Sequence, residues 1–325
     1  MDQLRLPGLG EGLDRVETAL RRAVALEDEF LTGVAGHLIG AGGKRIRPLL
    51  TLSAAAAAGA DMSEDAVQGA VSVELVHLGS LYHDDVIDDA GSRRGTESVN
   101  HRWGNLVAIL AGDFLLAKAS EIAAALGTEV AALLARTIGQ LCQGEVSQLR
   151  YAFRTDRPEG AYLQAIAGKT ASLMATSTRI GALVSHSPRP VVEALTAYGH
   201  AVGMTFQIWD DIRDLVATSE ALGKPAGHDM VEGTYTLPVI RALAVPGVGD
   251  ELRSLLGEPL DEAARDKARD LILTTDGVAE ATTEARRWAS VAEDAITPLR
   301  QCGPSDMIDA LSLLGHRLVD DLAET

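Results

Sequence analysis

Aromatic residues are scarce in this sequence of 325 residues. Phe, Trp and Tyr together make up 4% of the chain, although 46% of its residues are hydrophobic. β-Sheets concentrate aromatic and β-branched side chains, whereas the abundant Ala and Leu of this chain favour helices. The composition therefore predicts an all-α protein.

Basic residues are also in deficit. The chain has 29 Lys and Arg against 46 Asp and Glu, a formal net charge of −17. A nucleic acid or an anionic membrane surface would need an extended basic face, so the charge balance argues against either partner. An anionic substrate remains possible where cations gather locally, or where carboxylates hold a metal ion that supplies the positive charge.

Cysteines and long apolar runs are lacking as well. Cys142 and Cys302 are far apart and belong to no zinc-type cluster, so we expect two buried, reduced thiols. Charged residues interrupt every apolar run before 18 residues, and the N-terminus has no basic segment followed by an apolar stretch. We therefore expect no membrane span, no signal peptide and a cytoplasmic location.

Apolar residues instead recur every three or four positions, which is the period of an amphipathic helix. This pattern predicts a helix from Glu11 to about Leu38, a glycine-rich break at 40–43 and a second helix from Pro48 to Ala58. Ser63 reads as the N-cap of a long helix over 66–89. Further helices are predicted over 106–126, 129–151, 160–183, 191–216, 236–243 and beyond Asp261. Because no repeat or low-complexity linker occurs, we expect one domain.

Two acidic five-residue patterns, each at the end of an apolar helix, are the clearest sign of chemistry. They supply Asp84, Asp85 and Asp88 in the first copy and Asp210, Asp211 and Asp214 in the second. The first and last aspartates of each copy are four residues apart, hence on one helix face. Such like charges at a helix C-terminus are unfavourable unless cations bind, and Mg²⁺ takes carboxylates of this kind together with phosphate. One copy alone would more commonly be a solvated helix end, but two copies followed by basic residues indicate a metal site.

Cations cluster on a glycine-rich turn before the second predicted helix. Gly42-Gly43-Lys44-Arg45-Ile46-Arg47-Pro48 places three positive charges where backbone N–H groups also favour anions. The turn is a candidate diphosphate cradle, although a solvated basic loop is the alternative. Further candidate cations are Arg93, Arg94, Lys169 and Lys224.

Taken in order, these motifs resemble those of the trans-isoprenyl diphosphate synthase family. The matching segments are G-G-K-R-I-R-P at 42–48, D-D-V-I-D at 84–88, R-R-G at 93–95, G-K-T at 168–170, F-Q-I-W-D-D-I-R-D at 206–214 and G-K-P-A-G-H-D at 223–229. The resemblance implies a single polyprenyl synthetase domain over 1–325, folded as an isoprenoid synthase helical bundle with a central active-site cavity. It also implies a homodimer that condenses isopentenyl diphosphate head-to-tail with an allylic prenyl diphosphate, giving a longer all-trans polyprenyl diphosphate.

The resemblance also implies roles for individual residues. Isopentenyl diphosphate would be held by Lys44, Arg47, His77 and Arg94. Three Mg²⁺ ions would bind through the aspartate motifs, with Asp84, Asp88 and Asp210 as direct ligands. The allylic diphosphate would contact Arg93, Lys169 and Lys224, while Thr170 and Gln207 would face the developing allylic cation. The family commonly has a lysine where this chain has Thr234, so we expect somewhat weaker allylic binding.

Product length should depend on the residues upstream of the first aspartate motif. Family members with short products carry aromatics one helical turn upstream, where this chain has Gly79 and Ser80. One turn further back are Leu75 and Val76, which are aliphatic. Because a turn rises about 5.4 Å, close to one isoprene unit, this opening predicts a product of six to ten isoprene units. If Leu75 and Val76 form the floor, the product is geranylgeranyl diphosphate, with four units.

Three other functions fit the sequence less well. A class I terpene cyclase shares the first aspartate motif, but its second motif normally contains Asn or Asp, Ser or Thr, and Glu, and its cavity is rich in aromatics. A non-catalytic partner subunit of a prenyl synthase would have lost its sites, which are intact here apart from Thr234. An acidic helical scaffold would bind no diphosphate. The sequence therefore favours the prenyltransferase.

Overall fold

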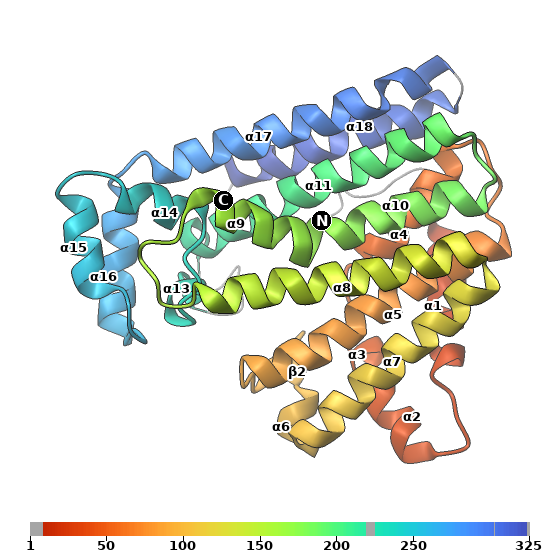
Figure 1. Ribbon diagram of the computed structural model, residues 1–325, viewed down its shortest axis with the longest axis horizontal. Coiled ribbons are helices and arrows are strands. Elements are labelled where there is room, and N and C mark those ends of the chain that lie inside the picture. Colours follow the sequence, from red (N-terminus) through yellow and green to blue (C-terminus); the bar gives the residue numbers. More distant parts are fainter. Residues whose placement is uncertain (1–8, 219–224, 302, 324–325) are drawn as a thin grey trace. The chain divides into compact units, whose positions relative to one another are not determined.

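The computed structural model describes residues 9–218, 225–301 and 303–323 (Figure 1). Helices make up most of these residues. The strands among them are β1, Ser92–Arg93, and β2, Thr96–Glu97, which pair antiparallel with Ser92 opposite Glu97. The prediction of an all-α protein is confirmed.

Contacts divide the described chain into two compact units. The first draws on residues 1–138, 173–199 and 298–310, and the second on 139–172, 200–297 and 311–325. Four helices contribute residues to both units: α8 (Thr128–Arg150), α10 (Ser172–Val184), α11 (Arg189–Val216) and α18 (Ser305–Asp320).

The N-terminal part of the first unit contains seven helices among its described residues. They are α1 Gly10–Ala23, α2 Glu29–Ala35, α3 His37–Gly40, α4 Ile46–Ala57, α5 Glu64–Ile87, α6 Val99–Trp103 and α7 Asn105–Ala125. The prediction of one helix from Glu11 to Leu38 is wrong, because α1, α2 and α3 occupy this stretch. Asp28 caps α2 by accepting a hydrogen bond from the Leu31 N–H at 2.9 Å, and this cap starts a new helix.

Helix α5 is the buried centre of the first unit. Ser63 caps it as predicted, accepting from the Ala66 N–H at 3.1 Å, and Glu64 and Asp65 complement the positive end of the helix. From Ala66 to Val76 all but one residue of α5 is buried, as expected for a helix that is apolar on all sides. Helices α1, α4 and α7 pack against it, with α7 alongside much of its length (Figure 1).

Two glycines allow α5 and α7 to approach closely. A Cβ on Gly79 would lie 3.0 Å from the carbonyl oxygen of Gly112 and 3.2 Å from Leu116 Cγ. A Cβ on Gly112 would in turn clash with His83 Nε2 on α5 and lie 3.1 Å from the Gly79 carbonyl oxygen. Since real Cβ atoms rarely come this close, both positions require glycine at the observed helix spacing.

The second unit begins within α8 and contains a π-helical turn. The predicted helix over 160–183 is interrupted: α9 covers Glu159–Ile166, the π-helical turn η2 covers Ala167–Ala171, and α10 covers Ser172–Val184. From Leu173 on, α10 belongs to the first unit. The remaining elements of the second unit are α13 His228–Val231, α14 Leu237–Leu243, α15 Val248–Leu255, α16 Glu262–Leu273, α17 Gly277–Ile296, the short 3₁₀ turn η3 Thr297–Gln301, which it shares with the first unit, and η4 Asp321–Ala323. A buried core joins α9, η2, α11, α14, α17 and the end of α18, with Tyr162, Ile208 and Leu237 among its members.

The structure bears on two further expectations, one about membrane-spanning helices and one about buried cysteines. Within the described ranges, no helix combines the length and the apolar character needed to cross a bilayer. Cys142, expected to be buried, is exposed on α8, and Cys302 lies outside the described residues.

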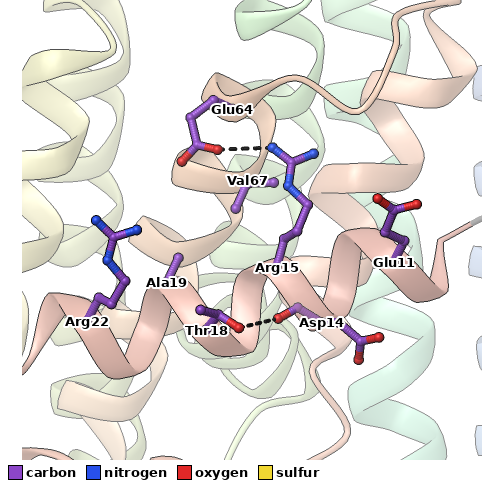
Figure 2. A pocket seen from close by; sticks show the side chains of 8 residues that line it. All are labelled: Glu11, Asp14, Arg15, Thr18, Ala19, Arg22, Glu64 and Val67. Atoms are coloured by element: carbon purple, nitrogen blue, oxygen red, sulfur yellow. Dashed lines mark hydrogen bonds and ion pairs between the residues drawn. The ribbon is translucent and has the colours of Figure 1, made fainter.

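A surface pocket of about 350 Å³ lies in the first unit between α1 and the start of α5. Figure 2 shows Arg15 reaching across it to Glu64 Oε2 at 3.0 Å, while the Thr18 hydroxyl donates to the Asp14 carbonyl oxygen. Its lining carries both signs of charge and includes none of the residues predicted to bind substrate. Nothing in the pocket selects a ligand.

Candidate active site

The glycine-rich turn adopts the strained backbone that its sequence suggests. Gly42 and Gly43 have φ of +83° and +146°, and Arg45, the N-cap of α4, has φ +47°. A Cβ on Gly43 would lie 2.7 Å from Arg94 Nη1, so only glycine allows this guanidinium to rest on the turn. Arg94 Nη1 donates to the carbonyl oxygens of Gly42 and Leu38. The turn and Arg94 therefore form one basic element.

His77 and Arg47 complete this basic element from α5 and α4. Arg94 Nη2 lies 3.4 Å from His77 Nε2. Because a guanidinium only donates, Nε2 must be the accepting nitrogen of a neutral imidazole. Burial and then the nearby positive charges hold the pKa of His77 well below its usual value, and burial lowers the pKa of Arg47 to about 10. Three residues predicted to hold isopentenyl diphosphate are thus brought together, with Lys44 exposed on the same turn.

Two carboxylates of this cluster, Glu74 and Glu17, were not predicted from the sequence, and both bind Arg45 of the predicted basic turn. Arg45 Nη1 donates to the carboxylate of Glu74 at 2.9 Å, and its Nε and Nη2 reach Glu17. Glu74 lies one turn before His77 on α5 and is 1% exposed. The available signal was a single carboxylate within the apolar run V-S-V-E-L-V.

The first aspartate motif closes α5. Asp84 is half-buried and Asp88, the C-cap, is exposed; the Asp88 N–H donates to the Asp84 carbonyl oxygen at 2.8 Å. Asp85 points to the other side and is fully buried, and Arg93 Nε donates to its Oδ1 at 2.7 Å. Burial raises the pKa of Asp85, and Arg93 opposes that rise. Asp84 and Asp88 therefore share the accessible face, while Asp85 anchors Arg93.

This donor set fits a hard divalent cation. Among the described residues, no group of three or more His, Cys, Asp or Glu side chains could hold a metal ion unaided. The pair Asp84 and Asp88 offers two carboxylates at four-residue spacing on one helix face. Mg²⁺ is typically bound by one or two carboxylates plus substrate phosphates and water, and this pair matches that requirement.

In the second unit, the π-helical turn presents Lys169 and Thr170. Lys169 Nζ lies 2.6 Å from the Glu145 carboxylate on α8. The π-helical turn and α8 meet at two glycines. A Cβ on Gly168 would lie 2.9 Å from the Gln140 carbonyl oxygen, and a Cβ on Gly144 would lie 2.9 Å from the carbonyl carbon of Gly168. A π-helical turn adds a residue to the helix and often marks a functional site.

A hydrogen-bond chain connects Thr170 to the second aspartate motif. The Thr170 hydroxyl donates to Gln207 Oε1 at 2.6 Å, and Gln207 Nε2 donates to Asp211 Oδ1 at 2.8 Å. Asp211 Oδ2 accepts from the Tyr162 hydroxyl at 2.6 Å. Burial, reinforced by Asp229, raises the pKa of Asp211 well above its usual value, and both donors oppose that rise. Tyr162 was not predicted, because a tyrosine on an apolar helix face is usually core.

The other aspartates of this motif differ in exposure. Asp210 is exposed, whereas Asp214 is buried and accepts from the Asp229 N–H at 3.1 Å. The Thr234 N–H in turn donates to the Asp229 carbonyl oxygen at 2.8 Å, so Thr234 lies close to the segment that contacts Asp214. Lys224, predicted to contact the allylic diphosphate, lies outside the described residues.

The predicted chain-length residues lie on several sides of α5. Leu75 and Val76 are fully buried, and the Ser80 hydroxyl donates to the His77 carbonyl oxygen at 2.9 Å. Gly79 faces α7 at the Gly112 contact. Their role in product length stays a prediction.

Comparison with known proteins agrees with these features. The model of the family described as polyprenyl synthetase matches residues 28–272. Heptaprenyl diphosphate synthase component 2 of Geobacillus stearothermophilus is 44% identical over 251 residues, covering 75% of this chain and 78% of the relative. Nonaprenyl diphosphate synthase of Mycobacterium tuberculosis is 40% identical over 284 residues, covering 86% and 84%.

Solved structures are similar as well. The polyprenyl synthase from Caulobacter crescentus, solved in complex with calcium and isoprenyl diphosphate, superposes with a TM-score of 0.90 at 33% identity, over 98% of this chain and 97% of that one. Geranylgeranyl diphosphate synthases are also among the similar structures. The fold is therefore the all-α isoprenoid synthase fold. With this fold, the family match over 28–272 and the close relatives, the chain belongs to the polyprenyl synthetase family and is a prenyltransferase.

Proposed function

We propose that the protein condenses isopentenyl diphosphate head-to-tail with an allylic prenyl diphosphate and releases an all-trans product of six to ten isoprene units. The observation that carries this proposal is the order of groups along one face of α5. His77, with Arg47 and Arg94 beside it, precedes Asp84 by seven residues, or about 10 Å of helix. A basic cluster and a pair of carboxylates thus follow one another along one helix, which supports a diphosphate site beside a metal site.

The basic cluster is assigned to isopentenyl diphosphate. Lys44, Arg47 and Arg94 supply positive charge, and neutral His77 supplies a ring nitrogen. This diphosphate does not leave during the reaction, so the cluster needs to bind and orient it without activating it. Arginines suit this task, because their forked donors match phosphate oxygens.

The aspartate motifs are assigned to Mg²⁺, with three ions per active site and Asp84, Asp88 and Asp210 as direct ligands. Bound Mg²⁺ would neutralise the charge that develops on the departing allylic diphosphate. Asp85, Asp211 and Asp214 are buried and would orient neighbouring groups; Asp85, for example, accepts from Arg93, which is assigned to the allylic diphosphate. The calcium with which the Caulobacter polyprenyl synthase was solved supports a divalent cation.

The residues of the π-helical turn are assigned to the allylic substrate. Lys169 and Arg93, with Lys224, would contact its diphosphate. The Thr170 hydroxyl donates a hydrogen bond to Gln207 Oε1, so the lone pairs of the Thr170 oxygen remain available to stabilise the allylic cation. Because neither group is a strong nucleophile, the double bond of isopentenyl diphosphate can attack instead.

Product length is supported by the names of the relatives, which include heptaprenyl and nonaprenyl diphosphate synthases. Geranylgeranyl diphosphate, with four units, is the second candidate, because synthases of that product are also similar. The test is to incubate purified protein with Mg²⁺, isopentenyl diphosphate and allylic primers of several lengths, and to measure product masses. An Asp84→Ala preparation controls for contaminating enzyme. Absence of any chain elongation would refute the proposed activity.

We also propose that the protein is a homodimer. Leu106, Ile109 and Leu110 are spaced three and four residues apart on α7, and all are exposed. Light scattering should give twice the chain mass for wild type. Leu110→Glu should shift it to the single-chain mass, while Leu273→Glu, which changes an exposed leucine on α16, should not. A cytoplasmic location and a single domain over 1–325 stay predictions.

A further inference from the structure

Glu74 is a buried carboxylate in the middle of an apolar helix. It is 1% exposed, and its Oε1 accepts from Arg45 Nη1 at 2.9 Å. Its Oε2 is buried and has no hydrogen-bond partner in the part of the chain that the structure describes. A buried carboxylate oxygen without a donor is costly, so another interaction must stabilise the charge.

Positive charges surround this carboxylate. Arg45 contacts it directly. Burial raises the pKa of Glu74, while the charges of Arg45, Arg47 and Arg94 oppose that rise and favour the ionised carboxylate. Glu74 is in turn the strongest of the negative charges that act on both Arg47 and Arg94. Arg47 and Arg94 repel each other, and Arg47 Nε is itself buried without a partner among the described residues. Glu74 therefore faces more positive charge than its single ion pair balances.

The other charged groups nearby do not replace Glu74. Glu17 pairs with Arg45 through two hydrogen bonds, but it is only a minor influence on Arg94. Asp84 acts on Arg47 more weakly than Glu74 does. His77 is neutral, as the low pKa and the accepting Nε2 both indicate. Removing Glu74 would leave Arg47 and Arg94 without their main counter-charge.

We propose that Glu74 is a positioning residue of the isopentenyl diphosphate subsite, where it serves as the internal counter-ion that holds Arg45, Arg47 and Arg94 together while no diphosphate is bound. This assignment rests on the proposed function of the basic cluster. It differs from a direct binding role, because an ionised carboxylate has no proton to donate to a phosphate oxygen.

This role has a definite sign. An arriving diphosphate brings its own negative charge to the arginines, so Glu74 is no longer needed and repels the ligand. Glu74 therefore stabilises the empty site and weakens binding. Glu74→Gln keeps the size of the side chain and an oxygen for Arg45, but it removes the charge. It should lower the unfolding temperature of the free protein and tighten isopentenyl diphosphate binding by about tenfold, since a unit charge a few ångströms away acts strongly in a partly buried site.

The experiment is a calorimetric titration of isopentenyl diphosphate into metal-free protein in EDTA, without allylic substrate so that no turnover occurs. Wild type, Glu74→Gln and Glu74→Asp are compared, each also by thermal unfolding with and without ligand. Glu74→Asp keeps the charge but alters packing, so its Kd should stay within about threefold of wild type, whereas Glu74→Gln binds more tightly. Saturating ligand should narrow the difference in unfolding temperature between Glu74→Gln and wild type.

Each other outcome is decisive. Equal or weaker binding by Glu74→Gln would overturn the counter-ion role while leaving the subsite assignment intact. A larger change in Kd for Glu74→Asp than for Glu74→Gln would show that shape and not charge matters, and would overturn it as well. If Glu74→Gln does not fold, the Kd of Glu74→Asp decides: a change beyond about threefold refutes the proposal. Failure of wild type to bind isopentenyl diphosphate would overturn the proposed function itself.

Discussion

Replacing Tyr162 by Phe removes one hydroxyl from the hydrogen-bond chain that ends at Thr170. Tyr162 is 1% exposed, and its hydroxyl donates to Asp211 Oδ2 at 2.6 Å. The other Asp211 oxygen fixes the Gln207 amide, whose Oε1 accepts from Thr170. Loss of the hydroxyl therefore affects the orientation of Thr170 through two intervening groups.

The size of the effect follows from the burial of Asp211. A hydrogen bond to a charged group contributes about 1.5–3 kcal/mol, so the free energy of unfolding should fall by about 2 kcal/mol. Tyr162 also opposes the burial that raises the pKa of Asp211, and without it the carboxyl group is more readily protonated. The Gln207 amide and the Thr170 hydroxyl then lose their fixed orientation, and we expect kcat to fall by about 10- to 100-fold.

The assay combines steady-state condensation with urea unfolding. The KM for isopentenyl diphosphate should not change, because the residues assigned to that substrate are not in this chain of hydrogen bonds. Tyr82→Phe is the matched control: Tyr82 is also fully buried, and its hydroxyl donates to the Val34 carbonyl oxygen at 2.8 Å. It should lose about 1 kcal/mol of stability with nearly unchanged kcat. Equal losses of kcat in the two variants, or none in Tyr162→Phe, would refute the positioning argument.

Four further predictions concern the assigned sites. Asp84→Ala or Asp210→Ala should lower kcat at least about 100-fold with little change in urea midpoint, and near-normal turnover would exclude these residues as metal ligands. Arg47→Ala should raise the KM for isopentenyl diphosphate more than the allylic KM, and the reverse would exchange the two subsites. The pKa of His77 is lower in the folded than in the unfolded chain, so the contribution of His77 to stability is present above about pH 6.5 and is lost as the pH falls. The His77→Gln variant should therefore show a flatter pH dependence of the unfolding free energy below that pH, and an unchanged slope would contradict this. Gly79→Phe should shorten products to three or four units and cost about 1–3 kcal/mol through crowding against α7, whereas unchanged long products would remove the basis of the length assignment.

Helix positions were predictable where an apolar period and a cap coincide. The predicted helix over 66–89 is α5 at Glu64–Ile87, and that over 106–126 is α7 at Asn105–Ala125. The π-helical turn at 167–171 was not predicted, because one added residue hardly alters an apolar period read from sequence. The break after Ala23 was also missed, although Asp28 supplied a capping signal.

The site was predictable as residue types but not as contacts. Repeated aspartates and the turn at 42–48 identified the chemistry, because their spacing along one helix or one loop fixes which groups are neighbours. The pairing of Glu74 with Arg45 joins residues 29 positions apart, and that of Tyr162 with Asp211 joins residues 49 apart. Such partners depend on which helices pack together, which a period within one helix does not reveal.

The contact between Gly79 and Gly112 has a consequence for how this protein can evolve. A bulky side chain at position 79 meets the carbonyl oxygen of Gly112, and one at position 112 meets that of Gly79. Neither helix can accept a larger residue unless the other moves away. A shift toward shorter products through position 79 would therefore need α7 to move away at Gly112, as well as a smaller residue at Leu116, before or together with the substitution. A single substitution at position 79 or 112 should therefore make the protein less stable than wild type. Selection for product length would more readily act at Ser80, which does not lie in the glycine contact.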